Sequence, residues 1–276
     1  MGEPEQHEIP FKERRLRFRN PRFRRGVFLV PALFTSANLI CGYFAVIAAL
    51  IGTTADFDRA AKAIGLAILF DSLDGRLARL LGANTDFGVQ FDSLADVVSF
   101  GVAPAVLAFA WGVRSLPNAE AQQVQLLSDM GWVCCLGFLV CCAWRLARFN
   151  VQGMAPGGSK YFVGLPTPAA AGVIAALVHG FNGRPLHDWR WSAVWFVLAA
   201  ALGALMTSTI RYYSFKDIPW TRRLPSLSIV LAFILIAVIV KFSEFALVIL
   251  ACTYVAVGGA LHLLRFVRHR MISRTA

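Results

Sequence analysis

The stretch Asp71–Asp96, DSLDGRLARLLGANTDFGVQFDSLAD, decides how the rest of the chain is interpreted through four of its five aspartates, Asp71, Asp74, Asp92 and Asp96. Asp71 and Asp74 are three residues apart, so both lie on one face of a helix. Asp92 and Asp96 are four residues apart, which is one turn of a second helix. Each pair therefore presents its acidic groups in a single direction.

The segment between the two pairs, Gly82–Gly88 (GANTDFG), is short and polar with glycine at both ends. It predicts a loop between antiparallel neighbouring helices, so the four carboxylates should converge. Like charges this close repel one another, and hard divalent cations such as Mg²⁺ or Mn²⁺ would relieve the repulsion. Gly75 and Ala78 continue the row of the first pair and leave room for a ligand against the helix backbone, and Arg79 is suited to pair with a phosphate.

At eight fixed positions this stretch resembles the signature of the CDP-alcohol phosphotransferase family, which here reads Asp71-x2-Asp74-Gly75-x2-Ala78-Arg79-x8-Gly88-x3-Asp92-x3-Asp96. Four further stretches look like the phosphatidylserine synthase branch of that family: DSLADVVSFGVAPA (92–105), RLARFN (145–150), GLPTPAAAG (164–172) and RYYSFKD (211–217). The resemblance spans most of residues 31–217. The plainer alternative is a set of buried carboxylates paired with arginines, or an ion pathway.

The resemblance implies transfer of a phosphatidyl group from CDP-diacylglycerol to the hydroxyl of L-serine, with release of CMP, by a homodimer. It implies two divalent ions, Mg²⁺ or Mn²⁺, held by Asp71, Asp74, Asp92 and Asp96. The same Asp96 would act as the general base. The expected CDP-diacylglycerol site comprises Thr35, Asn38, Asp71, Asp74, Gly75, Ala78, Arg79 and Gly88. The expected acceptor site comprises Arg145, Arg148 and Asn150.

Composition indicates an all-α membrane protein. The 276 residues are 57% hydrophobic and only 16% charged, as in a polytopic helical bundle. The net charge of +11 is concentrated in Lys12–Arg25 and at the ends of apolar segments, which favours membrane topology and anionic lipid headgroups over nucleic acid. Six cysteines lie in apolar runs without a C-x2-C pair, so we expect buried thiols and no disulfide framework.

Eight apolar segments predict about eight transmembrane helices, with a six-helix catalytic core. A basic arm (1–30) precedes the membrane domain (31–266), and a basic tail (267–276) follows it. The arm is either a lipid-binding surface segment with aromatic anchors or a charge cluster that holds the N-terminus in the cytoplasm. The predicted helices are Leu33–Ile51, Ala60–Leu81, Phe91–Val113, Met130–Phe149, Pro168–Phe181, Ser192–Ile210, Ser226–Val240 and Phe245–Phe266.

The distribution of basic residues predicts the orientation. With the N-terminus in the cytoplasm, 21 of the 27 Lys and Arg residues fall on the cytoplasmic side, as the positive-inside rule requires. Both termini and the four aspartates are then cytoplasmic, in a bacterial inner membrane.

Three alternatives stay open from sequence. Thr35 and Asn38 either approach the nucleotide or form hydrogen bonds between helices. The acceptor is serine or another alcohol, such as choline, glycerol 3-phosphate or inositol. From another class of protein, a cation-coupled or proton-coupled transporter would also use buried acids.

Overall fold

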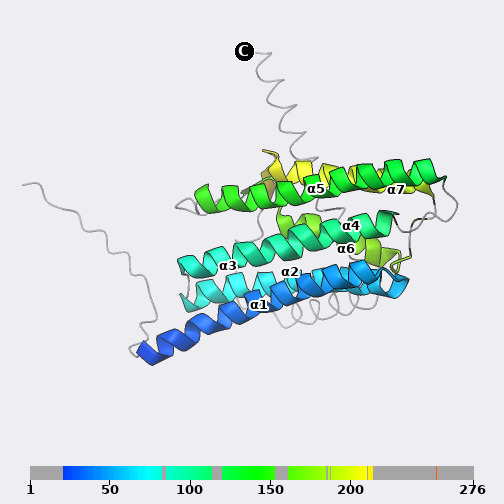
Figure 1. The fold of residues 1–276 in the computed structure, drawn as a ribbon. Coiled ribbons are helices and arrows are strands. Elements are labelled where there is room, and N and C mark those ends of the chain that lie inside the picture. Colours follow the sequence, from blue (N-terminus) through cyan, green and yellow to red (C-terminus); the bar gives the residue numbers. More distant parts are fainter. Residues whose placement is uncertain are drawn as a thin grey trace, which may run out of the picture.

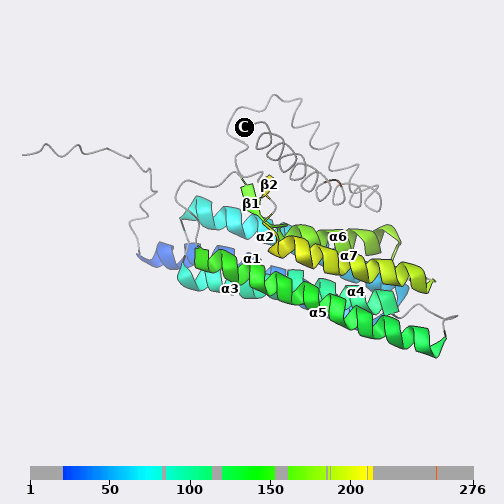
Figure 2. The ribbon, with the colours of Figure 1, turned by 90° about the horizontal axis from the view of Figure 1, so that it is seen from above.

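The computed structural model describes residues 21–82, 85–113, 120–152, 161–184, 186, 188–209, 211–213 and 253. Within these ranges the helices lie side by side along one long axis (Figures 1 and 2). The last two predicted helices lie outside the described residues apart from Thr253, as do the arm before Pro21 and the basic tail. The expected total of eight helices is therefore not tested.

The first six predicted apolar segments correspond to helices. The third of them is one continuous rod made of α3, a π-helical turn (η1) and α4. The helices are α1 (Pro21–Ile51), α2 (Thr54–Leu81), α3 (Asp86–Asp96), η1 (Val97–Val102), α4 (Ala103–Val113), α5 (Ala121–Gln152), α6 (Thr167–Gly180) and α7 (Trp189–Thr207).

The described residues are almost entirely helical, as the sequence predicts, and the structure adds one small ribbon. β1 (Tyr161–Val163) and β2 (Arg211–Tyr213) form a small antiparallel ribbon, and their aromatic and β-branched residues favour extended backbone. Gly164 then turns the chain with a φ of 80°, and Leu165 N donates to Leu205 O at 3.0 Å. The ribbon thus joins the start of α6 to the end of α7.

Four helical stretches are long and apolar enough to cross a membrane: Val30–Ile51, Asp86–Val113, Ala121–Val151 and Trp189–Thr207. The 28-residue α2 has sufficient length, but its second half carries charged residues, among them Asp71 and Asp74. The 14-residue α6 is apolar but short. The described residues therefore support a membrane protein with four candidate spans.

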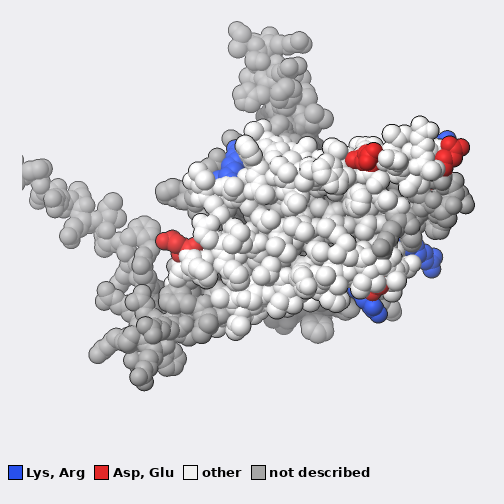
Figure 3. Space-filling view, viewed as in Figure 1, with Lys and Arg blue, Asp and Glu red and all other residues white. Residues whose placement is uncertain are grey.

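The molecular surface agrees with a membrane setting. Leu33 and Ile40 on α1 are each 66% exposed, which in water would be an unfavourable apolar patch. The face in Figure 3 has charged side chains toward its two ends and an uncharged band between them. Helices α1 and α2 pack against each other and carry fully buried alanines, among them Ala45, Ala49 and Ala60, and such small residues permit close helix packing.

The end of the bundle away from the acidic stretch is held by aromatic packing. Phe196 on α7 packs against Gly112 on α4 and Gly131 on α5, where an added Cβ would meet its Cζ at 2.6 Å. Trp195 Nε1 donates to Ala108 O at 2.9 Å. The three helices thus approach one another where glycine permits. The five described cysteines are free thiols.

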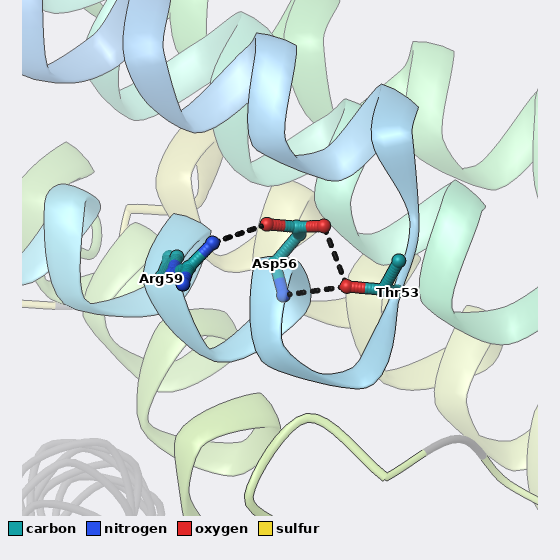
Figure 4. A network of polar contacts seen from close by, with 3 residues as sticks. All are labelled: Thr53, Asp56 and Arg59. Atoms are coloured by element: carbon teal, nitrogen blue, oxygen red, sulfur yellow. Dashed lines mark hydrogen bonds and ion pairs between the residues drawn. The ribbon is translucent and has the colours of Figure 1, made fainter.

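The turn from α1 to α2 is fixed by local chemistry. Gly52 adopts a φ of 73° after α1, as residues that follow a helix C-terminus often do. Thr53 then caps α2: its Oγ1 accepts from Asp56 N at 3.2 Å and donates to Asp56 Oδ2 at 2.5 Å (Figure 4). Arg59 Nη1 donates to Asp56 Oδ1 at 3.0 Å (Figure 4).

Candidate functional site

Three of the four aspartates that the sequence singles out lie together. One carboxylate oxygen from each of Asp71, Asp74 and Asp92 lies within 4.8 Å of the others. Asp71 and Asp74 come from the second half of α2, and Asp92 comes from α3. Thr85 sets the direction of α3, because its side chain accepts from Gly88 N at 3.0 Å as an N-cap.

The fourth aspartate, Asp96, is separate from this close group. It is the last residue of α3 and is buried, and it interacts electrostatically with Asp71, Asp92 and Asp74. The π-helical turn η1 begins directly after it. Single π-turns inside α-helices occur frequently at functional sites.

Helix α1 contributes two polar side chains to the acidic residues. Thr35 Oγ1 donates to Asp74 Oδ2 at 2.8 Å, and Asn38 Nδ2 donates to Asp96 Oδ1 at 3.1 Å. Both residues are buried. Both are hydrogen bonds between helices, which is one of the two roles that the sequence left open for Thr35 and Asn38. Both bonds also end on carboxylates of the site.

The other residues predicted for CDP-diacylglycerol binding lie on α2 and α3, the helices that carry the acidic group. Gly75 and Ala78 are half-buried on α2, one and four residues after Asp74. Gly88 lies in the first turn of α3, where its amide is used by the Thr85 cap. Arg79 is within α2, but its side chain lies outside the described residues.

The three residues predicted for acceptor binding lie near the end of α5. Asn150 Nδ2 donates to Ser93 Oγ at 2.9 Å, which joins α5 to the residue after Asp92. Arg145 and Arg148 are half-buried on the same helix. The structure therefore brings Asn150 next to the acidic helix α3.

Two serines were not singled out from the sequence. Ser93 accepts the hydrogen bond from Asn150, and Ser99 Oγ donates to the backbone carbonyl of Asn38 at 2.9 Å. Their positions, one residue after Asp92 and three after Asp96, were the available signal. A hydroxyl next to a motif carboxylate is too common to interpret without the partner helix.

The donor set fits a hard divalent cation. The close group offers only carboxylate oxygens, the ligands that Mg²⁺ and Mn²⁺ prefer. Asp92 Oδ1 is buried, and no hydrogen bond satisfies it among the described residues. An unsatisfied buried carboxylate oxygen is costly, and a bound cation would remove that cost.

The fold and the site together define a class: a helical membrane protein with a group of carboxylates, able to hold a divalent cation, where α2 and α3 meet. The family model described as CDP-alcohol phosphatidyltransferase matches residues 28–205. The chain belongs to this family.

Several relatives carry one and the same name, CDP-diacylglycerol–serine O-phosphatidyltransferase. The relative from Helicobacter pylori is 31% identical over 198 residues, which cover 72% of this chain and 77% of the relative. The relative from Methanocaldococcus jannaschii is 32% identical over 193 residues, 70% of this chain and 78% of the relative. The relative from Mycobacterium leprae is 36% identical over 196 residues, 67% of this chain and 58% of the relative.

Proposed function

We propose that this chain is an integral membrane transferase that moves the phosphatidyl group of CDP-diacylglycerol to the hydroxyl of L-serine, giving phosphatidylserine and CMP. The observation that carries the proposal is the group of three carboxylates within 4.8 Å, located in the motif of a CDP-alcohol phosphatidyltransferase. The serine acceptor is supported by the shared name of the bacterial and archaeal relatives.

Asp71, Asp74 and Asp92 would hold two divalent cations between them. Asp96 would lie close to the second cation. When bound, Mg²⁺ or Mn²⁺ would neutralise the pyrophosphate of the donor and the charge on departing CMP. Thr35 orients one ligand, because its hydroxyl occupies Asp74 Oδ2.

The remaining chemistry is a single displacement. The serine hydroxyl oxygen forms a bond to the phosphorus that carries the diacylglycerol, and the bond from that phosphorus to the bridging pyrophosphate oxygen breaks. The electron pair leaves with CMP. Asp96 receives the hydroxyl proton, since a serine hydroxyl is a poor nucleophile unless it loses its proton during attack.

The substrates would enter from two sides. Gly75 and Ala78 have no side chain beyond Cβ, so the cytidine part of the donor would approach the backbone of α2, with Arg79 near its phosphates. Asn150 and the two arginines of α5 would hold the carboxylate of serine or the new phosphodiester.

The setting we propose is a bacterial inner membrane, with eight helices, both termini in the cytoplasm and the site open to the cytoplasm. The excess of basic residues in the predicted cytoplasmic segments supports this orientation. A nucleotide-linked donor and a free amino acid would then meet at headgroup depth. We further propose a homodimer.

The test is release of CMP from CDP-diacylglycerol by purified protein in detergent with Mn²⁺ or Mg²⁺. Serine, glycerol 3-phosphate, inositol and choline are offered one at a time, with Asp96→Asn as the control. Release with serine alone, lost in Asp96→Asn, supports the proposal. Release with another alcohol keeps the reaction type and removes serine as the acceptor, whereas no release with any of them removes the proposal.

A further inference from the structure

Asn38 is buried deeply in the bundle although its side chain is polar. Its exposed fraction is 0%, and Asp96, 58 residues later in the chain, is also buried. Asn38 Nδ2 donates to Asp96 Oδ1 at 3.1 Å. The amide of α1 thus contacts the carboxylate that the proposed reaction uses as its base.

The orientation of this amide is determined by its partner. A reversed amide would direct Asn38 Oδ1 at the carboxylate, and two acceptors would face each other. In the observed orientation, Asn38 Oδ1 has no hydrogen-bond partner within the described part of the chain. The bond to Asp96 is therefore the interaction that keeps the Asn38 side chain in place.

A second contact fixes the backbone of α1 against the same helix. Ser99 Oγ donates to the Asn38 carbonyl at 2.9 Å, and Ser99 is itself fully buried. Gly42, one turn after Asn38, lies against Ser99 so closely that an added Cβ would be 2.5 Å from its Oγ. Ser99 lies in the π-helical turn η1 that follows Asp96.

We propose that Asn38 is a positioning residue that holds the Asp96 carboxylate in one rotamer, with Ser99 and Gly42 setting the register of α1. With Oδ1 occupied by the amide, Asp96 Oδ2 is the atom that receives the proton of the acceptor hydroxyl. The inference rests on the proposed function and goes beyond it, because Asn38 acts on the base and not on the donor nucleotide. Positions of catalytic groups matter within about 0.5 Å.

The experiment compares Asn38→Leu, which has a similar volume and no donor, with Asn38→Gln, which keeps an amide. CMP release gives kcat and the KM values of CDP-diacylglycerol and serine. Mn²⁺ binding to each protein without substrates is measured by electron paramagnetic resonance. Ser36→Ala is the matched control, since the Ser36 hydroxyl bonds within α1 to Ala32 O.

For Asn38→Leu we expect kcat to fall about tenfold to hundredfold, a part of what a general base contributes. Both KM values and the Mn²⁺ affinity of the group formed by Asp71, Asp74 and Asp92 should stay within about threefold, because Asn38 bonds to Asp96, which is outside that close group. Asn38→Gln should recover part of kcat, and Ser36→Ala should match the unaltered protein.

Three results would overturn the inference: an unchanged kcat, a raised KM for CDP-diacylglycerol at unchanged kcat, or a parallel loss of Mn²⁺ affinity. If Asn38→Leu does not fold, Ser99→Ala decides, with a lower kcat at unchanged KM supporting the inference and an unchanged kcat overturning it. An unaltered protein that releases no CMP with any acceptor would instead remove the proposed function. The two failures are thus distinguishable.

Discussion

Thr35 Oγ1 lies 2.8 Å from Asp74 Oδ2, so a hydroxyl of α1 donates to a carboxylate of α2 that is 39 residues away in sequence. Because Asp74 belongs to the close group with Asp71 and Asp92, this bond sets how one ligand oxygen faces the others. A neutral hydroxyl that binds an ionised carboxylate is worth about 1.5–3 kcal/mol.

Replacing Thr35 with valine keeps the shape of the side chain and removes the donor. We expect the apparent Mn²⁺ affinity to fall about tenfold to hundredfold, since each 1.4 kcal/mol changes an equilibrium constant tenfold. Thr35→Ser keeps the hydroxyl and should stay close to the unaltered protein. Equal Mn²⁺ titrations for the valine and serine variants would show that the bond to Asp74 does not organise the site.

The acidic group could be predicted from sequence because its information is local. The spacing of Asp71 and Asp74 fixes one helical face, and the short loop before α3 brings Asp92 to it. The bond from Asn38 to Asp96 and the π-helical turn after Asp96 could not be predicted, because they depend on how α1 packs against this helix.

In the fold, too, local features could be predicted from the sequence, and contacts between distant segments could not. Apolar runs predicted α1 and α5, because membrane helices are selected by length and hydropathy. The ribbon of β1 and β2 was missed, since two three-residue strands 47 residues apart leave no periodic pattern. The pairing of Asn150 with Ser93 was missed for the same reason: it is a contact between distant helices.

Gly42 provides a test of helix packing. An added Cβ would lie 2.5 Å from Ser99 Oγ and 2.8 Å from Ser99 Cα, so Gly42→Ala requires α1 to move away from η1. Overpacking of this kind costs about 1–3 kcal/mol, and the thermal midpoint of unfolding in detergent should fall. Gly137→Ala on α5 is the matched control, because nothing lies within 4 Å of its added Cβ.

For the control, alanine is the better helix former by about 1 kcal/mol, so Gly137→Ala should keep or raise the midpoint. A Gly42→Ala protein as stable as Gly137→Ala would contradict the close contact between α1 and η1. Differential scanning fluorimetry with a thiol-reactive or intrinsic tryptophan signal provides the measurement.

His179 connects α6 to α2. Its Nδ1 lies 2.5 Å from Asp58 Oδ1, and Lys62 Nζ lies 2.7 Å from Asp58 Oδ2. The His179 side chain is 7% exposed and that of Lys62 is 61% exposed. Loss of a buried partner is expected to cost more than loss of an exposed one, because water replaces only the exposed one.

We therefore expect His179→Leu to lower the free energy of unfolding by about 1–3 kcal/mol and Lys62→Met by about 0–1 kcal/mol. Chemical denaturation in mixed micelles measures both. Mn²⁺ binding should be unaffected in either variant, since neither residue touches the acidic group. A larger effect from Lys62→Met would mean that Asp58 depends chiefly on its exposed partner.

The charge of Asp56, at the start of α2, makes the stability of the folded protein depend on pH. The hydrogen bond from the Thr53 hydroxyl lowers the pKa of Asp56 below its ordinary value. Desolvation acts in the opposite direction, and Arg59 adds to the lowering of the pKa. The folded protein then binds this proton less tightly than the unfolded chain, so the stabilisation is present above the unfolded pKa of about 3.9. It is lost as pH falls through the lower pKa of the folded state.

Asp56→Asn should therefore be less stable than the unaltered protein at about pH 7, and the difference should shrink as pH falls below about 4. Thermal midpoints of the two proteins, measured in parallel across this range, give the difference directly. The other aspartates titrate in both proteins, so their effects cancel. In a Thr53→Val background the difference at about pH 7 should be smaller, because the main cause of the lowered pKa is gone. A difference that stays constant on acidification would show that Asp56 stabilises α2 through packing and not through its charge.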